Sequence, residues 1–196
     1  MWADQAFYKL LSDYDFDTVL DVGSGTGEHS KMFRDHGKHV TTIDLTQPAD
    51  ITGDFLSCPP ELVSESPYAC IWSSHVLEHQ TNVGAFLERC FYLLDDDGIL
   101  AITVPPLKHE IVGGHVSLWN AGLLLYNLVL AGFDCSQAAV KTYGYNISVI
   151  VRKKPAKMPR LCMDSGDINA LKRFFPMVVD EGFIGQIDQI NWNKTE

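Results

Sequence analysis

The chain has 196 residues, 46% of them hydrophobic, and a formal net charge of −10 at pH 7. This length suits one domain with a core of its own, without disulfides or metals. The negative charge argues against nucleic acid as a partner, because affinity for phosphates depends on Lys and Arg. No apolar run approaches the roughly 20 residues of a membrane span, and no signal segment is evident, so we expect a cytoplasmic protein without membrane insertion. The wide spacing of the cysteines favours reduced thiols: Cys58, Cys70, Cys90, Cys135 and Cys162.

The first elements are a short amphipathic helix, predicted at residues 1–11, and a strand at 18–22 that leads into a glycine-rich loop. Gly23, Gly25 and Gly27 allow positive φ angles and let a ligand lie against the backbone. The next residues, 28–36, predict a helix that Gly37 ends, so free N–H groups at its start face the loop. The glycine spacing is G-x-G-x-G, whereas dinucleotide-binding loops have G-x-G-x-x-G. A glycine-rich turn without a ligand is the alternative.

A second apolar strand, predicted at 39–43, ends in Asp44 and Leu45. In a βαβ unit a carboxylate at this position lies beside the glycine loop, where it can accept hydrogen bonds from both hydroxyls of a ribose. An acidic residue that merely caps the loop is the alternative. The position at a strand end after a glycine loop favours the ribose.

The segment 68–79 begins as a continuous apolar strand, at 69–73, and becomes polar. Strands buried on both faces have such uninterrupted runs, and Ser73, Ser74 and His75 then stand at the carboxyl end. His75, Glu78 and His79 also fit H-x-x-E-H, a zinc-peptidase signature. That reading needs both histidines on one helix face and a third ligand elsewhere, and we disfavour it.

Later patterns continue the alternation of strands and helices, which implies a mainly parallel sheet covered on both faces. Residues 133–143 and 145–152 predict a final hairpin around Gly144. The other predicted elements are strands at 49–52 and 98–104, a helix from the cap Asn82 to the acidic stop at 95–98, a helix at 120–131 closed by Gly132, and a tail helix capped by Asp167 and bearing Ile168, Leu171, Phe174 and Phe175.

Four stretches together resemble class I S-adenosylmethionine-dependent methyltransferases: 21–27 with the glycines, the acid Asp44, 53–56, and 68–79. The resemblance covers about residues 15–152. It implies an α/β, Rossmann-like, doubly wound fold with a mostly parallel seven-stranded sheet, a terminal antiparallel strand beside the fifth, and helices on both faces. We expect a methyltransferase domain at 1–152 and an extension at 153–196 that packs on it as a lid or interface.

The resemblance also implies the cofactor S-adenosyl-L-methionine, with S-adenosyl-L-homocysteine as product. No clear cluster of carboxylates or histidines in the sequence demands a metal, so we expect none. Asp54 would meet the exocyclic amine of adenine through its carboxylate, and Phe55 would meet the ring edge through its backbone. An ordinary turn is the alternative for Asp54. The full set of expected cofactor contacts is Asp21, Gly23, Ser24, Gly25, Gly27, Asp44, Leu45, Asp54, Phe55, Ser73 and Ser74.

The acceptor is expected at the loop 105–118, because ligands of open α/β sheets bind beyond the carboxyl ends of the strands. A hydroxyl acceptor would need a general base, usually histidine. We rank His115 first, since Gly113 and Gly114 let the loop close, and we keep His75 and His109 as candidates. Trp72 is expected in the core, and Trp119 either in the core or as a platform for a sugar ring.

The predicted function is methyl transfer to a small molecule, with O-methylation of a sugar, nucleotide-sugar or glycan end as the first choice. The alternatives are N- or O-methylation of another small metabolite, an inactive cofactor-binding subunit, and a nicotinamide oxidoreductase, which the glycine spacing disfavours. A homodimer is one option for assembly. The basic residues between Arg152 and Arg160 are interpreted as a solvated linker, or else as a contact for a phosphate or acidic sugar.

Overall fold

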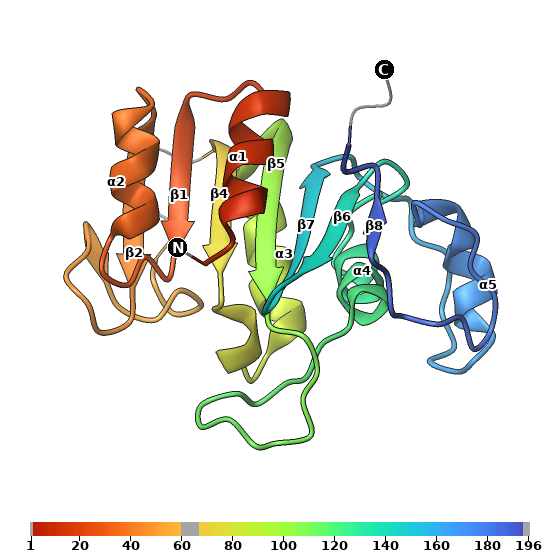
Figure 1. Cartoon of the computed structure of the whole chain (residues 1–196). Helices are drawn as coiled ribbons and strands as arrows, with labels where there is room; N and C mark the ends of the chain where they lie inside the picture. The colour runs from red at the N-terminus through yellow and green to blue at the C-terminus, as the bar shows by residue number, and fades with distance from the viewer. Residues whose placement is uncertain (1, 60–66, 194–196) are drawn as a thin grey trace.

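The computed structural model describes residues 2–59 and 67–193. Its centre is an eight-stranded sheet in the order β3-β2-β1-β4-β5-β7-β6-β8 (Figure 1). The five strands from β3 to β5 pair in parallel, and β7 pairs antiparallel with both β5 and β6. In chain order, with 3-10 helices written η, the elements are α1 (Asp4–Asp13), β1 (Thr18–Val22), α2 (Glu28–Asp35), β2 (His39–Asp44), β3 (Ile51–Thr52), β4 (Tyr68–Ser74), η2 (Leu77–His79), α3 (Val83–Leu93), β5 (Leu94–Val104), α4 (Ala121–Leu130), β6 (Ala139–Tyr143), β7 (Asn146–Arg152), α5 (Asp167–Leu171), η3 (Lys172–Phe174) and β8 (Gln189–Ile190).

Both faces of the sheet are covered, which confirms the predicted doubly wound α/β fold. Successive strand residues point to opposite faces, so Val19 joins the core under α1 and α2, whereas Leu20 joins the core under α3 and α4. In Figure 1, α1 crosses in front of the sheet and α3 and α4 lie behind it. The antiparallel β7 beside β5 is the terminal strand that the sequence predicted.

The predicted cap Asn82, the predicted helix start Asn120 and the predicted stop Gly132 lie at helix ends as expected. Asn82 accepts a hydrogen bond from the Ala85 N–H at 3.1 Å at the start of α3. Asn120 does the same for Leu123 at 2.8 Å in α4. Gly132, which follows α4, takes the positive φ of 103° that suits a glycine after a helix.

Several predicted boundaries were wrong. The sheet has eight strands rather than seven, because the tail adds β8, which pairs with β6. The strand predicted at 98–104 begins at Leu94, and its register against β4 shifts between Tyr68 and Cys70, so the acidic run bulges within β5. The strand predicted at 133–143 begins only at Ala139. The first helix begins at Asp4, so Trp2 lies outside it and is 58% exposed.

Asp167 is also placed differently from the prediction. Its carboxylate accepts hydrogen bonds from the backbone N–H groups of Cys162 at 2.9 Å and Met163 at 2.7 Å, which precede it. The predicted cap therefore stabilises the turn before α5 instead of the helix start. Ile168, Leu171 and the two phenylalanines that follow join the main core, so the tail packs on the domain.

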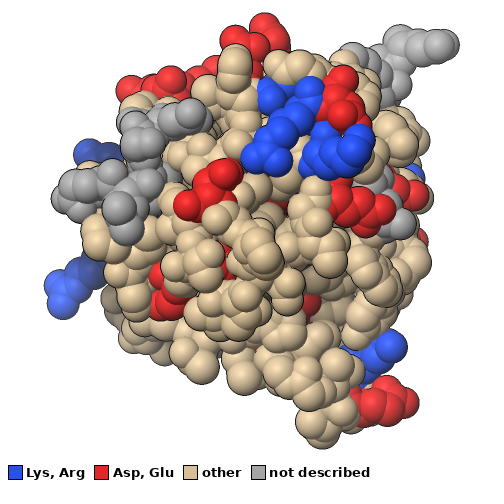
Figure 2. Space-filling view, turned by 90° about the vertical axis from the view of Figure 1, so that its left-hand side faces the viewer, with Lys and Arg blue, Asp and Glu red and all other residues tan. Residues whose placement is uncertain are grey.

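Charge and hydropathy agree with the composition. Figure 2 shows one face on which several Lys and Arg residues gather near the upper edge and a few others stand apart at the left and lower right, with acidic and uncharged residues over most of the remainder. Within the described ranges, no helix is both long and apolar enough to cross a membrane. All five cysteines are free, and only Cys162 is exposed.

Candidate active site

A cavity of about 350 Å³ opens at the carboxyl ends of β1, β2 and β4. Six of the predicted cofactor residues line it: Gly23, Gly25, Asp44, Leu45, Asp54 and Phe55. The size lies within the range of small-molecule sites, roughly 300–1,000 Å³. The glycine loop and the acid of the next strand therefore meet at one site, as the βαβ topology required.

The glycine loop is held by β2 on one side and by the segment after β4 on the other. Gly23 and Ser24 both donate backbone hydrogen bonds to the Ile43 carbonyl, at 2.8 and 3.3 Å. A Cβ added at Gly23 would lie 2.2 Å from Val76 Cγ2, whereas one added at Gly25 would meet no described heavy atom within 4 Å. Gly23 thus permits close packing inside the protein, and Gly25 leaves its backbone open to the cavity.

We expect Gly23→Ala to destabilise the protein more than Gly37→Ala. Both glycines have similar positive φ angles, 73° and 78°, but the Cβ position of Gly37 has no described neighbour within 4 Å. The backbone conformation alone costs an alanine about 1–2 kcal/mol, and the overlap with Val76 adds roughly 1–3 kcal/mol at Gly23. Denaturant unfolding of the two variants measures the difference. Equal losses in the free energy of unfolding would show that the Val76 side chain moves aside without cost.

Asp44 is an anion fixed in place by backbone groups. Its Oδ1 accepts hydrogen bonds from Thr46 and Gln47 at 3.0 and 2.8 Å, and its Oδ2 accepts one from Gly25 at 2.9 Å. Partial burial acts to raise the pKa of Asp44, but these three N–H groups outweigh it and hold the pKa below its usual value. The carboxylate therefore spans from β2 to the glycine loop, and Oδ2 keeps a lone pair for a further donor.

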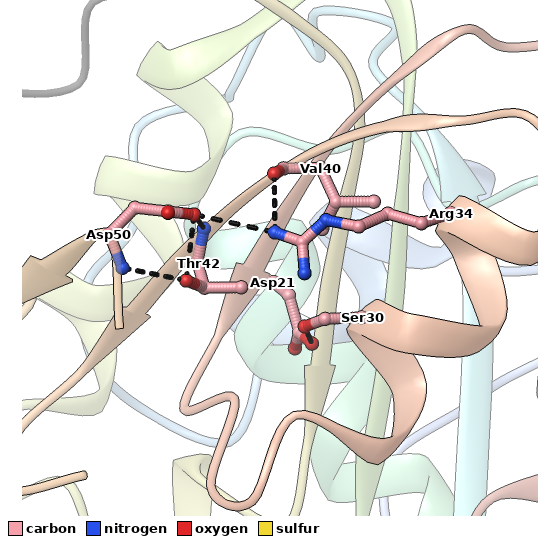
Figure 3. Close-up of polar contacts among 6 residues, drawn as sticks. All are labelled: Asp21, Ser30, Arg34, Val40, Thr42 and Asp50. Carbon is pink, nitrogen blue, oxygen red and sulfur yellow. Dashed lines mark hydrogen bonds and ion pairs between the residues drawn. The ribbon is translucent and has the colours of Figure 1, made fainter. Parts of the chain in front are cut away.

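Asp21 lies beneath the glycine loop and points toward α2. Ser30 donates a hydrogen bond to its Oδ2 (Figure 3). Two further contacts fix the same region: Arg34 donates to the Val40 carbonyl at 2.9 Å, and Asp50 accepts from the Thr42 hydroxyl at 2.8 Å. Asp21 is 2% exposed and lies outside the cavity lining that the described residues form. In this position it joins β1 to α2 and supports the loop from behind.

Asp21 predicts a pH dependence of stability. Burial raises its pKa to about 6, against the opposing effects of Ser30 and Arg34, and Asp44 raises it further. Because the folded-state pKa exceeds the unfolded value of 3.8, the folded protein holds the extra proton, and this contribution is full below pH 3.8 and lost as the pH rises through 6. The original protein should lose on the order of 3 kcal/mol of its free energy of unfolding between pH 4 and pH 7 through Asp21, and Asp21→Asn should remove this loss. Urea unfolding at both pH values tests this. If the free energy of unfolding changed with pH by the same amount in both proteins, the prediction would be contradicted.

The other predicted cofactor residues divide into two groups. Leu45 is 66% exposed at the cavity, and Phe55 is buried against Phe86 with ring centroids 5.0 Å apart. The Asp54 carboxylate accepts hydrogen bonds from Ser57. The ordinary turn that was the alternative to an adenine contact at Asp54 is therefore present. Outside the cavity lining, as the described residues define it, are Asp21, Ser24, Gly27, Ser73 and Ser74.

The buried hydroxyl oxygens of three predicted residues, Ser24, Ser73 and Ser74, have no hydrogen-bond partner among the described residues. Buried hydroxyl groups are normally paired. Gly27 precedes α2 with φ 77° and, in the described structure, no side-chain cap bonds the start of that helix. The free donors therefore gather around the glycine loop.

His75 is held between two protein oxygen atoms. It takes a positive φ of 57° after β4, and its Nε2 lies 2.9 Å from Asn146 Oδ1, while its Nδ1 lies 3.3 Å from Glu78 Oε1. Both ring nitrogens thus face acceptors. Burial acts to lower the pKa of His75, but Glu78 and Asn146 outweigh it and raise the pKa. Because each ring nitrogen already faces a protein oxygen, this geometry disfavours His75 as a base for the acceptor.

The loop between β5 and α4 hangs below the carboxyl ends of the strands (Figure 1) and encloses a second cavity of about 200 Å³. His115 lines this cavity, together with Lys108 and Tyr145, whose ring lies 4.1 Å from the Lys108 ammonium. His109 is exposed and lies outside the lining that the described residues form. Trp119 is only 2% exposed and belongs to the core.

The two cavities share a wall that the sequence did not reveal. His79, which lines the first cavity, packs edge-to-face against His115 of the second, with ring centroids 5.0 Å apart. Val76 and Gln80 also line the first cavity. All three first-cavity residues follow β4, so the signal was their place at a carboxyl strand end. The H-x-x-E-H segment forms the 3-10 helix η2 after His75, not the α-helix that the zinc-peptidase signature requires.

The basic residues after β7 are absent from the lining of both cavities as the described residues form it. Arg152, the last residue of β7, pairs with Ile99 in the middle of β5, away from the carboxyl end of that strand. Arg152 bonds the Asp97 carbonyl at 3.1 Å, and Lys153 bonds the Leu94 carbonyl at 2.6 Å. These contacts secure the strand end, so the expectation of an acceptor phosphate at Arg152 and Lys153 is not supported.

The comparisons with known proteins agree with this geometry. A family described as a methyltransferase domain matches residues 5–128, more than half of the chain. Among curated proteins, no sequence matches significantly. The chain belongs to the methyltransferase-domain family, and it is an S-adenosylmethionine-dependent methyltransferase.

Solved structures share the fold. The Burkholderia thailandensis 1,6-didemethyltoxoflavin N1-methyltransferase, solved with 1,6-didemethyltoxoflavin and S-adenosylhomocysteine, is 20% identical over 76% of each chain, with a TM-score of 0.60. A putative methyltransferase from Bacillus halodurans is 14% identical over 79% of this chain and all of its own, with a TM-score of 0.61. Human N-acetylserotonin methyltransferase, solved with S-adenosylmethionine, is 17% identical over 75% of this chain and 51% of its own, with a TM-score of 0.57.

Proposed function

We propose that this methyltransferase acts on a small metabolite that enters between the two cavities. The observation that carries the proposal is the arrangement of an open cavity at the glycine loop beside a second, smaller cavity under the loop 105–118. Two of the similar structures are named for small acceptors, 1,6-didemethyltoxoflavin and N-acetylserotonin. This favours N- or O-methylation of a non-sugar metabolite over the sugar or glycan end that the sequence suggested.

The residues at the first cavity fit the cofactor. Asp44 offers a lone pair for the ribose hydroxyls, and the exposed Leu45 offers an apolar surface beside it. The open backbone at Gly25, the unpaired hydroxyl of Ser24 and the uncapped start of α2, as far as the described residues show, suit the polar methionine end. When bound, S-adenosylmethionine supplies a methyl group on a positively charged sulfur, whose leaving group is a neutral thioether.

The protein's task is then mainly alignment, which contributes on the order of 7–11 kcal/mol in well-oriented systems. A hydroxyl acceptor must in addition lose its proton. Because both nitrogens of His75 are engaged and His109 is exposed, His115 is the histidine best placed to act on the acceptor. Tyr145 and Lys108 on the same cavity would limit the shape of the acceptor.

Two measurements test this proposal. Calorimetry with S-adenosylmethionine should show one saturable site, and NAD should not compete for it. A panel of small phenols, amines, heterocycles and sugars, assayed with labelled cofactor, should then show transfer to a non-sugar member. Cofactor binding without any transfer would instead support the inactive partner subunit, and transfer to sugars alone would restore the first expectation.

The assignment of residues 153–196 as an extension of the domain, the homodimer, the cytoplasmic location and the exclusion of nucleic acid remain predictions. Size-exclusion chromatography with light scattering tests the dimer. The pairing of β8 with β6 supports the view that the extension packs on the domain.

A further inference from the structure

A carboxylate and two imidazoles converge at the wall between the two cavities. One ligand atom from each of Glu78, His79 and His115 lies within 4.8 Å of the other two. Glu78 and His79 come from η2 after β4, whereas His115 comes from the loop before α4. The sequence analysis found no such cluster, because its members lie on two distant segments.

Backbone bonds hold the two segments together. The Val116 N–H donates to the Glu78 carbonyl at 2.8 Å, and the Gly114 carbonyl lies 2.8 Å from His79 Nδ1. A Cβ at Gly114 would lie 3.1 Å from that same nitrogen, and its φ is 83°, so a glycine is needed for this approach. The position of His115 beside His79 is therefore fixed by the main chain on both sides.

Glu78 is a buried carboxylate that lacks hydrogen bonds to the described residues. Its side chain is 1% exposed, and neither oxygen has a hydrogen-bond partner among the described residues. Its Oε1 lies at ion-pair distances only, 3.3 Å from His75 Nδ1 and 3.9 Å from His79 Nε2. A buried charge is costly unless it is paired or coordinates a metal. His75 faces Oε1, and a cation bound on the side of His79 and His115 would add a partner for the carboxylate, which makes no hydrogen bond to the described residues.

His79 has the tautomer of a metal ligand. A carbonyl can only accept, so the bond to Gly114 places a proton on Nδ1, and in the neutral ring the Nε2 lone pair then points toward Glu78. Such a second bond from the far ring nitrogen is the usual support of metal-binding histidines. Two imidazoles with one carboxylate suit Zn²⁺, whereas Mg²⁺ prefers oxygen ligands alone.

The spacing is close to that of a bound site. Tetrahedral zinc with bonds of about 2.0–2.1 Å separates its ligand atoms by roughly 3.3 Å, against separations of up to 4.8 Å here. Closure needs side-chain rotations that bring the ligand atoms closer to one another by up to about 1.5 Å, the difference between these two separations. The exposed His79 and half-buried His115 have room for such rotations, and the buried Glu78 provides the fixed point.

We propose that Glu78, His79 and His115 bind one Zn²⁺ ion and leave its fourth position open for an oxygen of the acceptor. The second part rests on the proposed function. An acceptor hydroxyl at that position gives its proton to water, its oxygen forms the bond to the methyl carbon, and the electron pair of the broken carbon–sulfur bond returns to sulfur. His115 then acts on the acceptor as a metal ligand, and the zinc ion lowers the pKa of the hydroxyl.

Zinc titration of the chelator-treated, tag-free full chain tests the site. Calorimetry with zinc chloride should give one site per chain, and magnesium chloride should give none. We expect Glu78→Gln, His79→Gln and His115→Gln each to weaken zinc binding by at least about tenfold. His109→Gln is the matched control in the same loop and should keep the affinity of the original chain.

The opposite results overturn the proposal. One such result is the absence of saturable zinc binding. The other is an equal zinc affinity of His115→Gln and His109→Gln. Both variants change exposed or half-buried loop residues, so they avoid the folding risk of Glu78→Gln. A titration with S-adenosylmethionine on the same samples keeps the two hypotheses apart. Cofactor heat without zinc heat rejects only the metal site, and zinc heat without cofactor heat rejects only the proposed function.

Discussion

Alanine in place of Asp44 is expected to weaken S-adenosylmethionine binding by about 10- to 150-fold. The carboxylate is anionic, is fixed by three backbone N–H groups and lines the cavity beside the glycine loop. Hydrogen bonds to a charged group contribute about 1.5–3 kcal/mol each, which gives this range of affinity. The substitution also removes the hydrogen bond to Gly25 that fixes the glycine loop, and this loss further weakens cofactor binding. Isothermal calorimetry measures the change directly.

Asp50→Ala is the matched control for this substitution. Asp50 also accepts a backbone hydrogen bond, from Thr42 at 2.9 Å, and lies beside the same strand, but the described residues place it outside the cavity lining. We expect a modest loss of stability and an unchanged cofactor affinity. If the two variants bound the cofactor equally well, Asp44 would have only the role of a loop cap, which was its alternative reading.

The second large effect is expected at His115, where alanine should lower kcat by about 10²- to 10⁴-fold for a hydroxyl acceptor. The same variant should keep its cofactor affinity within about twofold, because His115 lines the second cavity and lies outside the described lining of the first. The assay uses the acceptor with the fastest transfer in the panel. A fall in kcat without a fall in cofactor affinity separates a role at the acceptor from a structural one.

Two further results sharpen this prediction. Chelator treatment of the original chain should reproduce the kcat loss if His115 acts through zinc, and should leave kcat unchanged if His115 acts as a free base. A variant at His109 that lost turnover while His115→Ala kept it would move the role to the exposed histidine and contradict the ranking.

The parts of the fold that the sequence predicted well are those with local causes. The apolar strand before Gly23 and the one before Asp44 lie side by side in the sheet, as a βαβ unit requires. Asn82 and Asn120 mark the starts of their helices because a cap acts on residues two or three positions away. The antiparallel β7 followed from a hairpin, which is also a local structure.

The predictions that failed have two kinds of cause. Asp167 carries the right side chain for a helix cap, yet its carboxylate accepts hydrogen bonds from the turn that precedes the helix. The others depend on partners far along the chain. The two-residue strand β8 exists only because the exposed edge of β6 is there to pair with it. Trp2 was assigned to a helix, but its ring lies 5.3 Å from that of His75 at the active site.

The sequence alone determined the nature of the cofactor cavity, because glycines at fixed spacing and an acid one strand later act over a few residues of backbone. The tertiary structure alone decided how the candidate histidines are placed. It engaged both nitrogens of His75, left His109 in solvent, and brought His115 to Glu78 and His79. The physical reason is that the protonation and ligand chemistry of an imidazole depend on the groups that face it, and those groups are set by the path of the whole chain.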